Sequence, residues 1–309
     1  LSYGELARRS TAFAAALVVV MAVMAALAVL LDLMTGPAGL PLGDTIAALT
    51  GRADVPRGTA IIVWEVRLPV AALALLVGAA LALAGAEMQT VLENPLAEPF
   101  TLGVSAAAAL GAATAIVLGL TVPFLPAVWS VSANAFVFAL GALGLLQLLG
   151  RLRGGGPEVL ILFGIALNFA AASLLSLLQF IASPDALQQL VFWTMGSLAA
   201  AEWRRVGVLA VVLVVTVPFS LRAAWQLTAL RMGADQARSF GVNVESLRRW
   251  TLLRVSLLSA SAVSLVGVIG FVGLAGPHIA RMLVGEDHRF FLPTSLLTGA
   301  LIMSLASTL

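Results

Sequence analysis

The sequence predicts an all-α membrane protein in which residues 1–309 form a single domain, a bundle of transmembrane helices. The first observation is composition: apolar residues make up 61% of the chain and charged residues only 10%, whereas a soluble domain carries about 25% charged residues. The second is that apolar runs close to the roughly 20 residues needed to cross a bilayer recur along the whole chain. Most of the surface is therefore expected to face lipid.

The first element is the apolar run Thr11–Leu31, which follows Arg8 and Arg9. A cleavable signal peptide also begins with basic residues, but its apolar region is only about 7 to 15 residues long. The longer run favours a spanning helix, with a signal peptide as the alternative.

Eight further spans are predicted if the apolar stretch Leu252–Val284 is divided into two helices, and seven if it is not. That stretch is too long for a single span, so nine spans in all are preferred. The remaining runs are Ile61–Ala86, Leu102–Leu120, Ala133–Leu149, Val159–Ile181, Val206–Leu221 and Leu292–Leu309.

The placement of arginine indicates that the N-terminus is cytoplasmic. All 17 basic residues are arginine. With the N-terminus inside, twelve of them fall in cytoplasmic segments and five outside, as the positive-inside rule requires. The inverted topology would place most of them outside.

Residues 77–111 contain two spans rich in glycine and alanine, joined by a short polar loop. Asn94-Pro95 and Glu98-Pro99 lie in that loop, and proline breaks a helix. Unpaired backbone groups are costly in lipid, so such a break must be covered by protein or reach water. Broken helices of this kind are typical of transporters.

Small residues recur at positions where helices would meet. They are Gly78, Ala82 and Gly85 in the second span, and Gly141 and Gly144 in the fourth. This spacing permits close approach of helices. In a chain so rich in alanine it also arises by chance, and both interpretations stay open.

The longest predicted cytoplasmic segment contains a short helix over Ala234–Phe240. Gly233 precedes this helix, and Gly241 is placed to end it with a positive φ angle. Phe240 and Val242 offer apolar contacts for docking into a groove of a soluble partner. The alternative is an ordinary solvated loop.

Polar side chains follow one face of the fifth span, where Asn168, Ser176 and Gln179 fall at helical spacing. Lipid disfavours such groups, so they are expected to face a water-filled path or to form hydrogen bonds between helices. At the start of this span, three glycines at 154–156 precede Pro157 and Glu158. They form either a gate hinge or a simple turn with a carboxylate at the helix start.

On the predicted outer side, Arg52, Arg57 and Arg67 are placed to bind either carboxylates of an external protein or lipid phosphates. The two histidines, His278 and His288, stand in different local settings and are expected to make structural contacts, so no metal site is predicted. The chain has no cysteine, and a phosphate-binding Walker loop needs a lysine that the chain lacks.

Several stretches resemble, in the same order, the permease subunits of ATP-binding-cassette (ABC) importers for iron-siderophore, haem and cobalamin, the FecCD-type or type II importer family. The resemblance covers nearly the whole chain. It rests on Val66–Pro69, Leu76–Gly85, Glu93–Ser105, Gly164–Asn168, Phe192–Leu198, Gly233–Val242, Gly270–Leu274, Pro277–Ile279 and Asp287–Arg289.

The resemblance implies ten helices per subunit in the cytoplasmic (inner) membrane, a homodimer or pseudo-dimer with the path on its axis, two cassette ATPases that bind ATP and Mg, and a periplasmic or lipid-anchored binding protein. The permease itself is then not an enzyme and binds no cofactor. By residue, it implies that an ATPase contacts Gly233, Ala234, Ala237, Arg238, Ser239 and Gly241. It assigns Asn168, Ser176 and Gln179 to the path, Pro157 and Glu158 to a gate, Asn94, Pro95 and Pro99 to the helix break, and Arg67 to binding-protein docking.

The chain departs from the family at two places. Val70 stands where the family often has an arginine, which weakens the expected contact with a binding protein. The sequence also stops at Leu309, near the end of the ninth span, so the expected tenth helix is absent from it.

The preferred function is an importer of a metal chelate, with ferric siderophore first and haem or cobalamin next, on the frequency of each in the family. The rival is a secondary transporter driven by an ion gradient, since broken helices suit it equally well. It would need carboxylates within the membrane, and Glu87 comes nearest to that requirement. A third possibility is a membrane scaffold that transports nothing.

Overall fold

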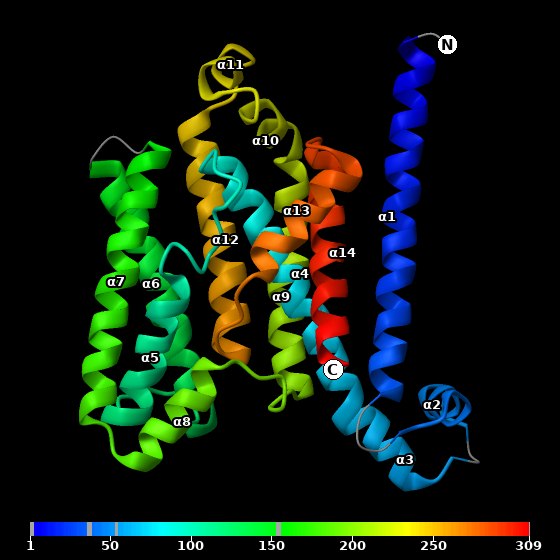
Figure 1. Ribbon diagram of the computed structural model, residues 1–309, viewed down its shortest axis with the longest axis vertical. Helices are drawn as coiled ribbons and strands as arrows, with labels where there is room; N and C mark the ends of the chain where they lie inside the picture. The colour runs from blue at the N-terminus through cyan, green and yellow to red at the C-terminus, as the bar shows by residue number, and fades with distance from the viewer. Residues whose placement is uncertain (1–2, 36–38, 53–54, 153–155, 309) are drawn as a thin grey trace.

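The computed structural model describes residues 3–35, 39–52, 55–152 and 156–308. Over these residues the chain is a bundle of helices that run roughly along one long axis (Figure 1), with no strand among them. Helix α11 (Ala234–Ser239) lies at one end of the bundle and α3 (Arg57–Ile61) at the other. We refer to these as the α11 end and the α3 end.

The predicted spans form helices, and six segments within the described residues are long and apolar enough to cross a membrane. The long helices are α1 (Tyr3–Met34), α4 (Leu68–Val91), α6 (Ser130–Leu152), α7 (Pro157–Ile181), α9 (Trp203–Arg222), α12 (Val244–Val266) and α14 (His288–Ser307). Shorter elements are α2 (Leu42–Leu49), the π-helical turn Ile62–Arg67 that joins α3 to α4, the 3₁₀ turn Ala127–Trp129, α8 (Pro184–Thr194) and α10 (Ala224–Leu230).

The apolar stretch Leu252–Val284 does form two helices, α12 and α13 (Val272–Val284). Helix α12 begins several residues before the predicted run. Its start is fixed by Asn243, whose side chain accepts a hydrogen bond from the Ser246 amide at 2.9 Å. Asparagine is among the preferred residues at this capping position.

Helices α5 (Val104–Leu118) and α13 are too short to cross a bilayer alone. With 15 and 13 residues they extend about 20 Å, whereas the hydrocarbon core is about 30 Å thick. Each is preceded by an irregular segment, residues 92–103 before α5 and residues 267–271 before α13.

These two irregular segments lie against each other inside the bundle. A Cβ atom at Gly273 would lie 3.5 Å from both Glu98 Oε2 and Pro99 Cδ, and one at Gly270 would lie 3.8 Å from Phe100 Cδ2. The buried Glu98 therefore sits beside the first turn of α13, where a carboxylate suits the positive end of the helix dipole. Pro99 and Gly267 are buried, whereas Leu96, Phe100 and Phe271 are exposed, so protein covers only part of each break.

Helix α4 is the centre of the bundle, and most of its residues are buried. It packs against α13 and α14 through glycine and alanine. A Cβ atom at Gly85 would overlap the Gly273 carbonyl oxygen, and one at Gly78 would lie 2.7 Å from the Gly299 carbonyl carbon. By contrast, Gly141 and Gly144 on α6 have nothing within 4 Å of a Cβ position. Close packing of small residues is thus present in the second span and not at the two glycines of the fourth.

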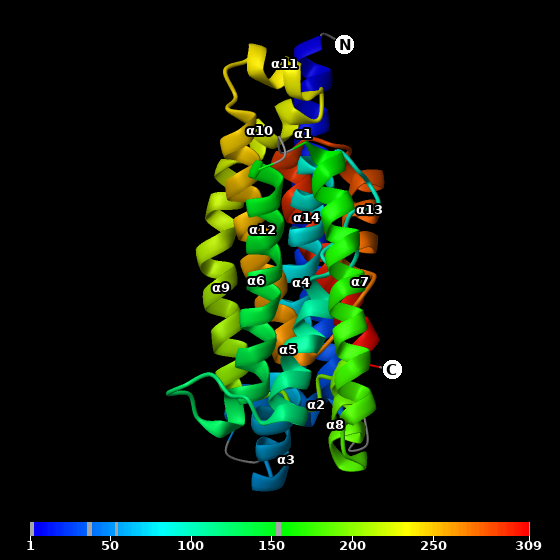
Figure 2. The same cartoon turned by 90° about the vertical axis from the view of Figure 1, so that its left-hand side faces the viewer.

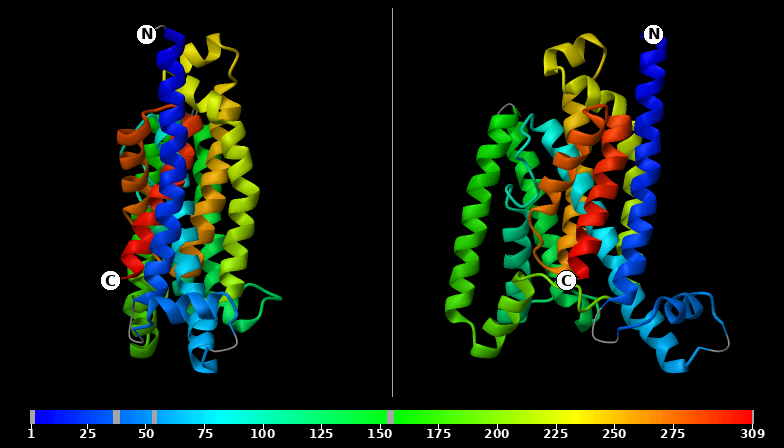
Figure 3. Two further views of the ribbon diagram at one scale, coloured as in Figure 1. Left: turned by 90° about the vertical axis from the view of Figure 1, so that its right-hand side faces the viewer. Right: turned by 45° about the vertical axis from the view of Figure 1, so that its right-hand side comes forward.

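Helices α1, α9, α12, α13 and α14 lie around α4, and α5 to α8 form the side of the bundle beyond α12 (Figure 1). Figure 2 shows α9 and α12 side by side, with α10 and α11 beyond them at the α11 end. Figure 3 shows α1 on the outside, where Met21, Ala25 and Ala28 pack against Leu301 of α14. At the α3 end, the Trp64 and Trp203 rings lie 6.5 Å apart. Tryptophan is enriched where helices cross the membrane interface.

One ion pair is buried in the bundle between α4 and α12. Glu87 is fully buried and Arg254 is 9% exposed. Arg254 donates to the Glu87 carboxylate from Nη2 at 2.8 Å and from Nε at 3.1 Å, and to Thr251 Oγ1 at 3.0 Å. Glu87, the carboxylate predicted to come nearest to the membrane interior, is therefore paired with Arg254.

Candidate coupling site

The segment between α9 and α12 projects from the α11 end of the bundle (Figure 1). It consists of α10, a turn and the six-residue helix α11. Gly233 precedes α11 with φ of 111°, and Gly241 follows it with φ of 83°. Both angles lie in a region that glycine adopts readily and other residues do not, and the helix bounds match the predicted ones within one residue.

The side chains of α11 divide into an inner and an outer set. Ala237 is fully buried against the bundle, whereas Arg238, Ser239 and Phe240 are exposed. Val242 is also buried, so the prediction that it offers an apolar contact to a partner is wrong. It instead anchors the segment to the core, which leaves Phe240 as the accessible apolar group of that pair.

Arg238 joins α11 to the first turn of α12. Its guanidinium donates to Asp235 at 2.8 Å and to Glu245 at 2.7 Å. The Arg238 hydrogen bond holds the pKa of Glu245 below its ordinary value. The segment therefore has a defined internal geometry even where it is exposed.

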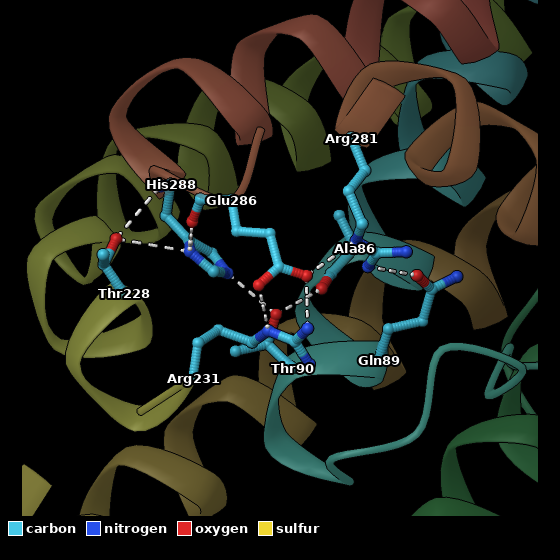
Figure 4. Close-up of polar contacts among 8 residues, drawn as sticks. All are labelled: Ala86, Gln89, Thr90, Thr228, Arg231, Arg281, Glu286 and His288. Atoms are coloured by element: carbon cyan, nitrogen blue, oxygen red, sulfur yellow. Dashed lines mark hydrogen bonds and ion pairs between the residues drawn. The ribbon is translucent and has the colours of Figure 1, made fainter. Parts of the chain in front are cut away.

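Just beneath α11, a set of polar side chains links α10 to α4 and to the turn between α13 and α14 (Figure 4). We call it the Glu286 cluster. It contains Gln89, Thr90, Thr228, Arg231, Arg281, Glu286 and His288.

Glu286 is the carboxylate shared by two arginines of this cluster. Arg231, at the end of α10, donates to it from both Nε, at 3.1 Å, and Nη2. Arg281 of α13 forms an ion pair with it, Nε to Oε1, at 3.1 Å. Arg281 also donates to Gln89 Oε1 of α4 at 2.9 Å. Glu286 thus connects α10 with α13 directly, and Arg281 extends this connection to α4.

His288, the first residue of α14, makes the second connection. Its amide donates to Thr228 Oγ1 of α10 at 3.0 Å, and its Nε2 lies 2.8 Å from Thr90 Oγ1 of α4. Its Nδ1 lies 3.0 Å from the Glu286 carbonyl oxygen, and a carbonyl can only accept, so Nδ1 carries the proton. His288 makes structural contacts, as expected. A displacement of α10 would therefore move α14 and α4 with it.

The ionisation of Glu286 determines the pH range over which the ion pairs of the cluster are formed. Burial raises the pKa of Glu286, but the neighbouring Arg231 and Arg281 outweigh this effect and hold the pKa below its ordinary value of 4.5. A carboxylate whose pKa is lowered by folding contributes stability above its unfolded pKa and loses it as the pH falls through the folded pKa. The cluster is therefore formed at neutral pH and is expected to weaken only once the pH falls below the ordinary carboxylate pKa of 4.5.

Replacing Glu286 with glutamine is expected to destabilise the α13–α14 turn by about 1 to 2 kcal/mol, because Arg231 and Arg281 would then face each other without an anion. Amide hydrogen exchange of residues 281–291 measures this effect directly. Glu158→Gln, which removes an exposed carboxylate at the same end of the bundle, is the matched control. Equal exchange in the two variants would contradict the role of Glu286.

The residues predicted to line a path lie on α7. Asn168 and Gln179 are half-buried, and Ser176 is exposed with its hydroxyl donating to the Ala172 carbonyl at 3.0 Å. The backbone of Asn168 packs against Gly103, where a Cβ atom would lie 2.8 Å from the Asn168 nitrogen. The structure thus brings Asn168, which is predicted to line the path, next to the break before α5.

The remaining predicted residues are spread over both ends of the bundle. Pro157 and Glu158 begin α7 at the α11 end, with Glu158 exposed, while Gly154 and Gly155 of the predicted hinge lie outside the described residues. Arg67 is half-buried at the end of the π-helical turn near the α3 end. Asn94, Pro95 and Pro99 lie in the irregular segment between α4 and α5, where Asn94 Oδ1 accepts from the Leu96 amide at 2.9 Å.

Comparison with known proteins agrees with this architecture. A sequence profile of the FecCD transport family matches residues 10–309. The chain belongs to the FecCD transport family.

Several proteins similar to this chain are named as permeases of transport systems. The chain is 38% identical to the hemin transport system permease protein HmuU of Yersinia pestis over 248 residues, which are 80% of this chain and 74% of HmuU. It is 38% identical to the ferric enterobactin transport system permease protein FepD of Escherichia coli (strain K12) over 280 residues, 90% of this chain and 82% of FepD.

The fold of this FecCD-family chain is also shared with a solved structure. An inward-facing metal-chelate type ABC transporter superposes with a TM-score of 0.83 at 30% identity, covering 94% of this chain and 89% of the other. The similarity covers nearly the whole chain, so the two proteins share the arrangement of their helices.

The Glu286 cluster was not predicted from the sequence. Arg231 and Glu286 are 55 residues apart, and no spacing rule connects such positions. The available signal was the run of charged residues at 286–289, directly before an apolar span.

Proposed function

We propose that this FecCD-family chain is the permease subunit of an ABC importer that moves a metal chelate across the cytoplasmic membrane, with the α11 end and the N-terminus in the cytoplasm. The observation that carries the proposal is the α10–α11 segment, which is exposed on its outer side and tied to three transmembrane helices on its inner side. Such a segment suits a subunit that receives movement from a soluble partner.

In this mechanism two partner ATPases bind ATP and Mg, close on each other and displace α11. The Glu286 cluster passes the displacement from α10 to α14 and α4, and the resulting helix tilts open or close the path. The permease supplies no chemical step, so its function depends on where its helices stand in each state.

A second copy of the chain would complete the path. Within one chain, only 17% of the apolar part of α7 is buried. Leu162, Phe169 and Phe180 of this helix are exposed. Exposed apolar residues of a spanning helix can face lipid, but lipid disfavours Asn168 and Gln179, so the half-buried polar face of α7 suits a homodimer interface that contains the path.

The rival function, coupling to an ion gradient, is less well supported. An ion site in the membrane needs a carboxylate that is free to bind the ion. Glu87 is engaged by two nitrogens of Arg254, so an ion would have to displace an arginine. Uptake into vesicles that contain an ion gradient but no ATPase would favour the rival.

Among chelates, ferric siderophore is our first proposal, followed by haem and cobalamin. The relatives HmuU and FepD carry names for two different cargoes, hemin and ferric enterobactin, and the neutral groups on α7 do not select between them. The deciding test is ATPase stimulation of the reconstituted complex by a periplasmic or lipid-anchored binding protein loaded with each chelate in turn. If none of the three loaded binding proteins stimulates the ATPase, the proposal that one of these three chelates is the cargo is contradicted.

Replacing Gly241 with valine is expected to uncouple ATP hydrolysis from uptake. A β-branched residue at φ of 83° costs about 1 to 2 kcal/mol of backbone strain, which is relieved by moving the end of α11. The measurement is uptake per ATP hydrolysed in proteoliposomes.

The matched control is Gly51→Val. Gly51 has a φ angle of 68° and open space around it, like Gly241, but it follows α2 at the α3 end. It carries a similar backbone strain and should leave coupling unchanged. Wild-type coupling in Gly241→Val would contradict the proposed role of α11.

A further inference from the structure

A groove of about 610 Å³ runs between α9 and α12 near the α11 end. It is separate from α7 and from the Glu286 cluster. Its lining comes from α9, from α12 and from Ala223, Gln226 and Asn243 of the segment that joins these two helices.

The polar groups of the lining differ between its two ends. Arg222, Gln226 and Asn243 lie toward the α11 end, whereas Val215 and Leu257 lie toward the middle of the bundle. Thr216 and Arg254 also lie toward the middle, but the Thr216 hydroxyl donates to the Val212 carbonyl and Arg254 is paired with Glu87. Within the described residues, the unpaired cation of the lining therefore lies at the α11 end, about 10 Å along the helix from Val215, which is the order in which a lipid passes from headgroup to acyl chain.

The depth of the groove also suits a lipid. Arg222 is the last residue of the membrane-spanning helix α9, and Trp250 of α12 is 57% exposed. Arginine at a helix end and tryptophan at its side are the residues that anchor helices at the headgroup level. Phe219 and Leu253 are likewise exposed, so the groove is open to the bilayer along its apolar part.

The charge of the groove is positive. Its lining contains no carboxylate, and Arg222 has no ion-pair partner among the described residues. The Arg222 guanidinium instead lies 5.5 Å from the centre of the Phe219 ring. Arg254 at the base is balanced by Glu87. One uncompensated cation remains, beside the amide and hydroxyl groups of Gln226, Asn243 and Ser246.

We infer that this groove binds one anionic phospholipid, with the phosphate at Arg222 and an acyl chain along Val215 and Leu257. The bound lipid would fill the space between α9 and α12 directly below the segment that carries α11. The site rests on the geometry of the groove and does not depend on the proposed transport function.

Trp250 provides the probe for this site. The full chain is placed in nanodiscs of phosphatidylcholine that contain the same fraction of brominated phosphatidylglycerol or brominated phosphatidylcholine. The difference in fluorescence between the wild type and Trp250→Phe isolates the Trp250 signal. We expect phosphatidylglycerol to occupy the site with about fivefold preference, the factor typical of one basic residue near a membrane surface, and to quench Trp250 correspondingly more strongly.

Two variants assign this preference to the groove. Arg222→Gln should abolish it, whereas Arg249→Gln, which removes an exposed arginine next to Trp250 but outside the lining, should retain it. Gln226→Glu places a negative charge at the polar end by an isosteric change and should also abolish the preference, which keeps the test valid if Arg222→Gln does not fold. Equal quenching by both lipids, or equal loss in Arg249→Gln, would overturn the assignment.

Discussion

Replacing Gly85 with leucine is expected to prevent the bundle from assembling. Gly85 lies on α4 directly against the Gly273 carbonyl group, and a Cβ atom there would overlap the backbone of the neighbouring half-helix. Forcing extra atoms into a packed core costs about 1 to 3 kcal/mol where side chains can adjust. Here a backbone group would have to move, so a loss of at least about 3 kcal/mol is expected.

The matched control is Gly144→Leu, since Gly144 shows the same small-residue spacing but is exposed with open space around it. Surface changes of this kind stay within about 0.5 kcal/mol. Yield of monodisperse protein and the thermal unfolding midpoint in detergent report both effects. A folded Gly85→Leu protein with the stability of Gly144→Leu would contradict the packing described for α4.

The second large effect is expected at the buried ion pair. Replacing Glu87 with leucine leaves Arg254 charged and buried without a partner, which costs about 3 to 5 kcal/mol. The measurement is again the unfolding midpoint, together with the fraction of protein that inserts in a folded form.

The double variant Glu87→Leu/Arg254→Met separates charge from packing. Replacing both partners by apolar residues of similar size is often neutral or stabilising, so the double variant should recover most of the lost stability. If it is no more stable than Glu87→Leu alone, the cost arises from packing and not from the unpaired arginine.

Local features of this fold could be predicted from the sequence because they depend on neighbouring residues. The spans follow from the length of apolar runs, and the split of Leu252–Val284 follows from its excess length. The short helix α11 follows from Gly233 and Gly241, which adopt the positive φ angles that its ends require.

Features that depend on distant residues could not be predicted in the same way. Gly85 and Gly144 each follow another small residue at the same spacing. Only the fold shows that Gly85 lies against the backbone of α13, whereas a Cβ atom at Gly144 would have no neighbour within 4 Å. Arg254 and Glu87 are 167 residues apart. Val242 seemed available to a partner because it is apolar and next to a loop, but the fold places it in the core.

The contact between the irregular segments before α5 and α13 has a mechanical consequence. Residues 92–103 join α5 to the long helix α4, and residues 267–271 join α13 to the long helix α12, so each short helix is connected through chain that lacks regular helical hydrogen bonds. A break in these hydrogen bonds is where a helical path changes direction. The two short helices can therefore leave the directions of α4 and α12, and the contact of Glu98 with the first turn of α13 holds them against each other.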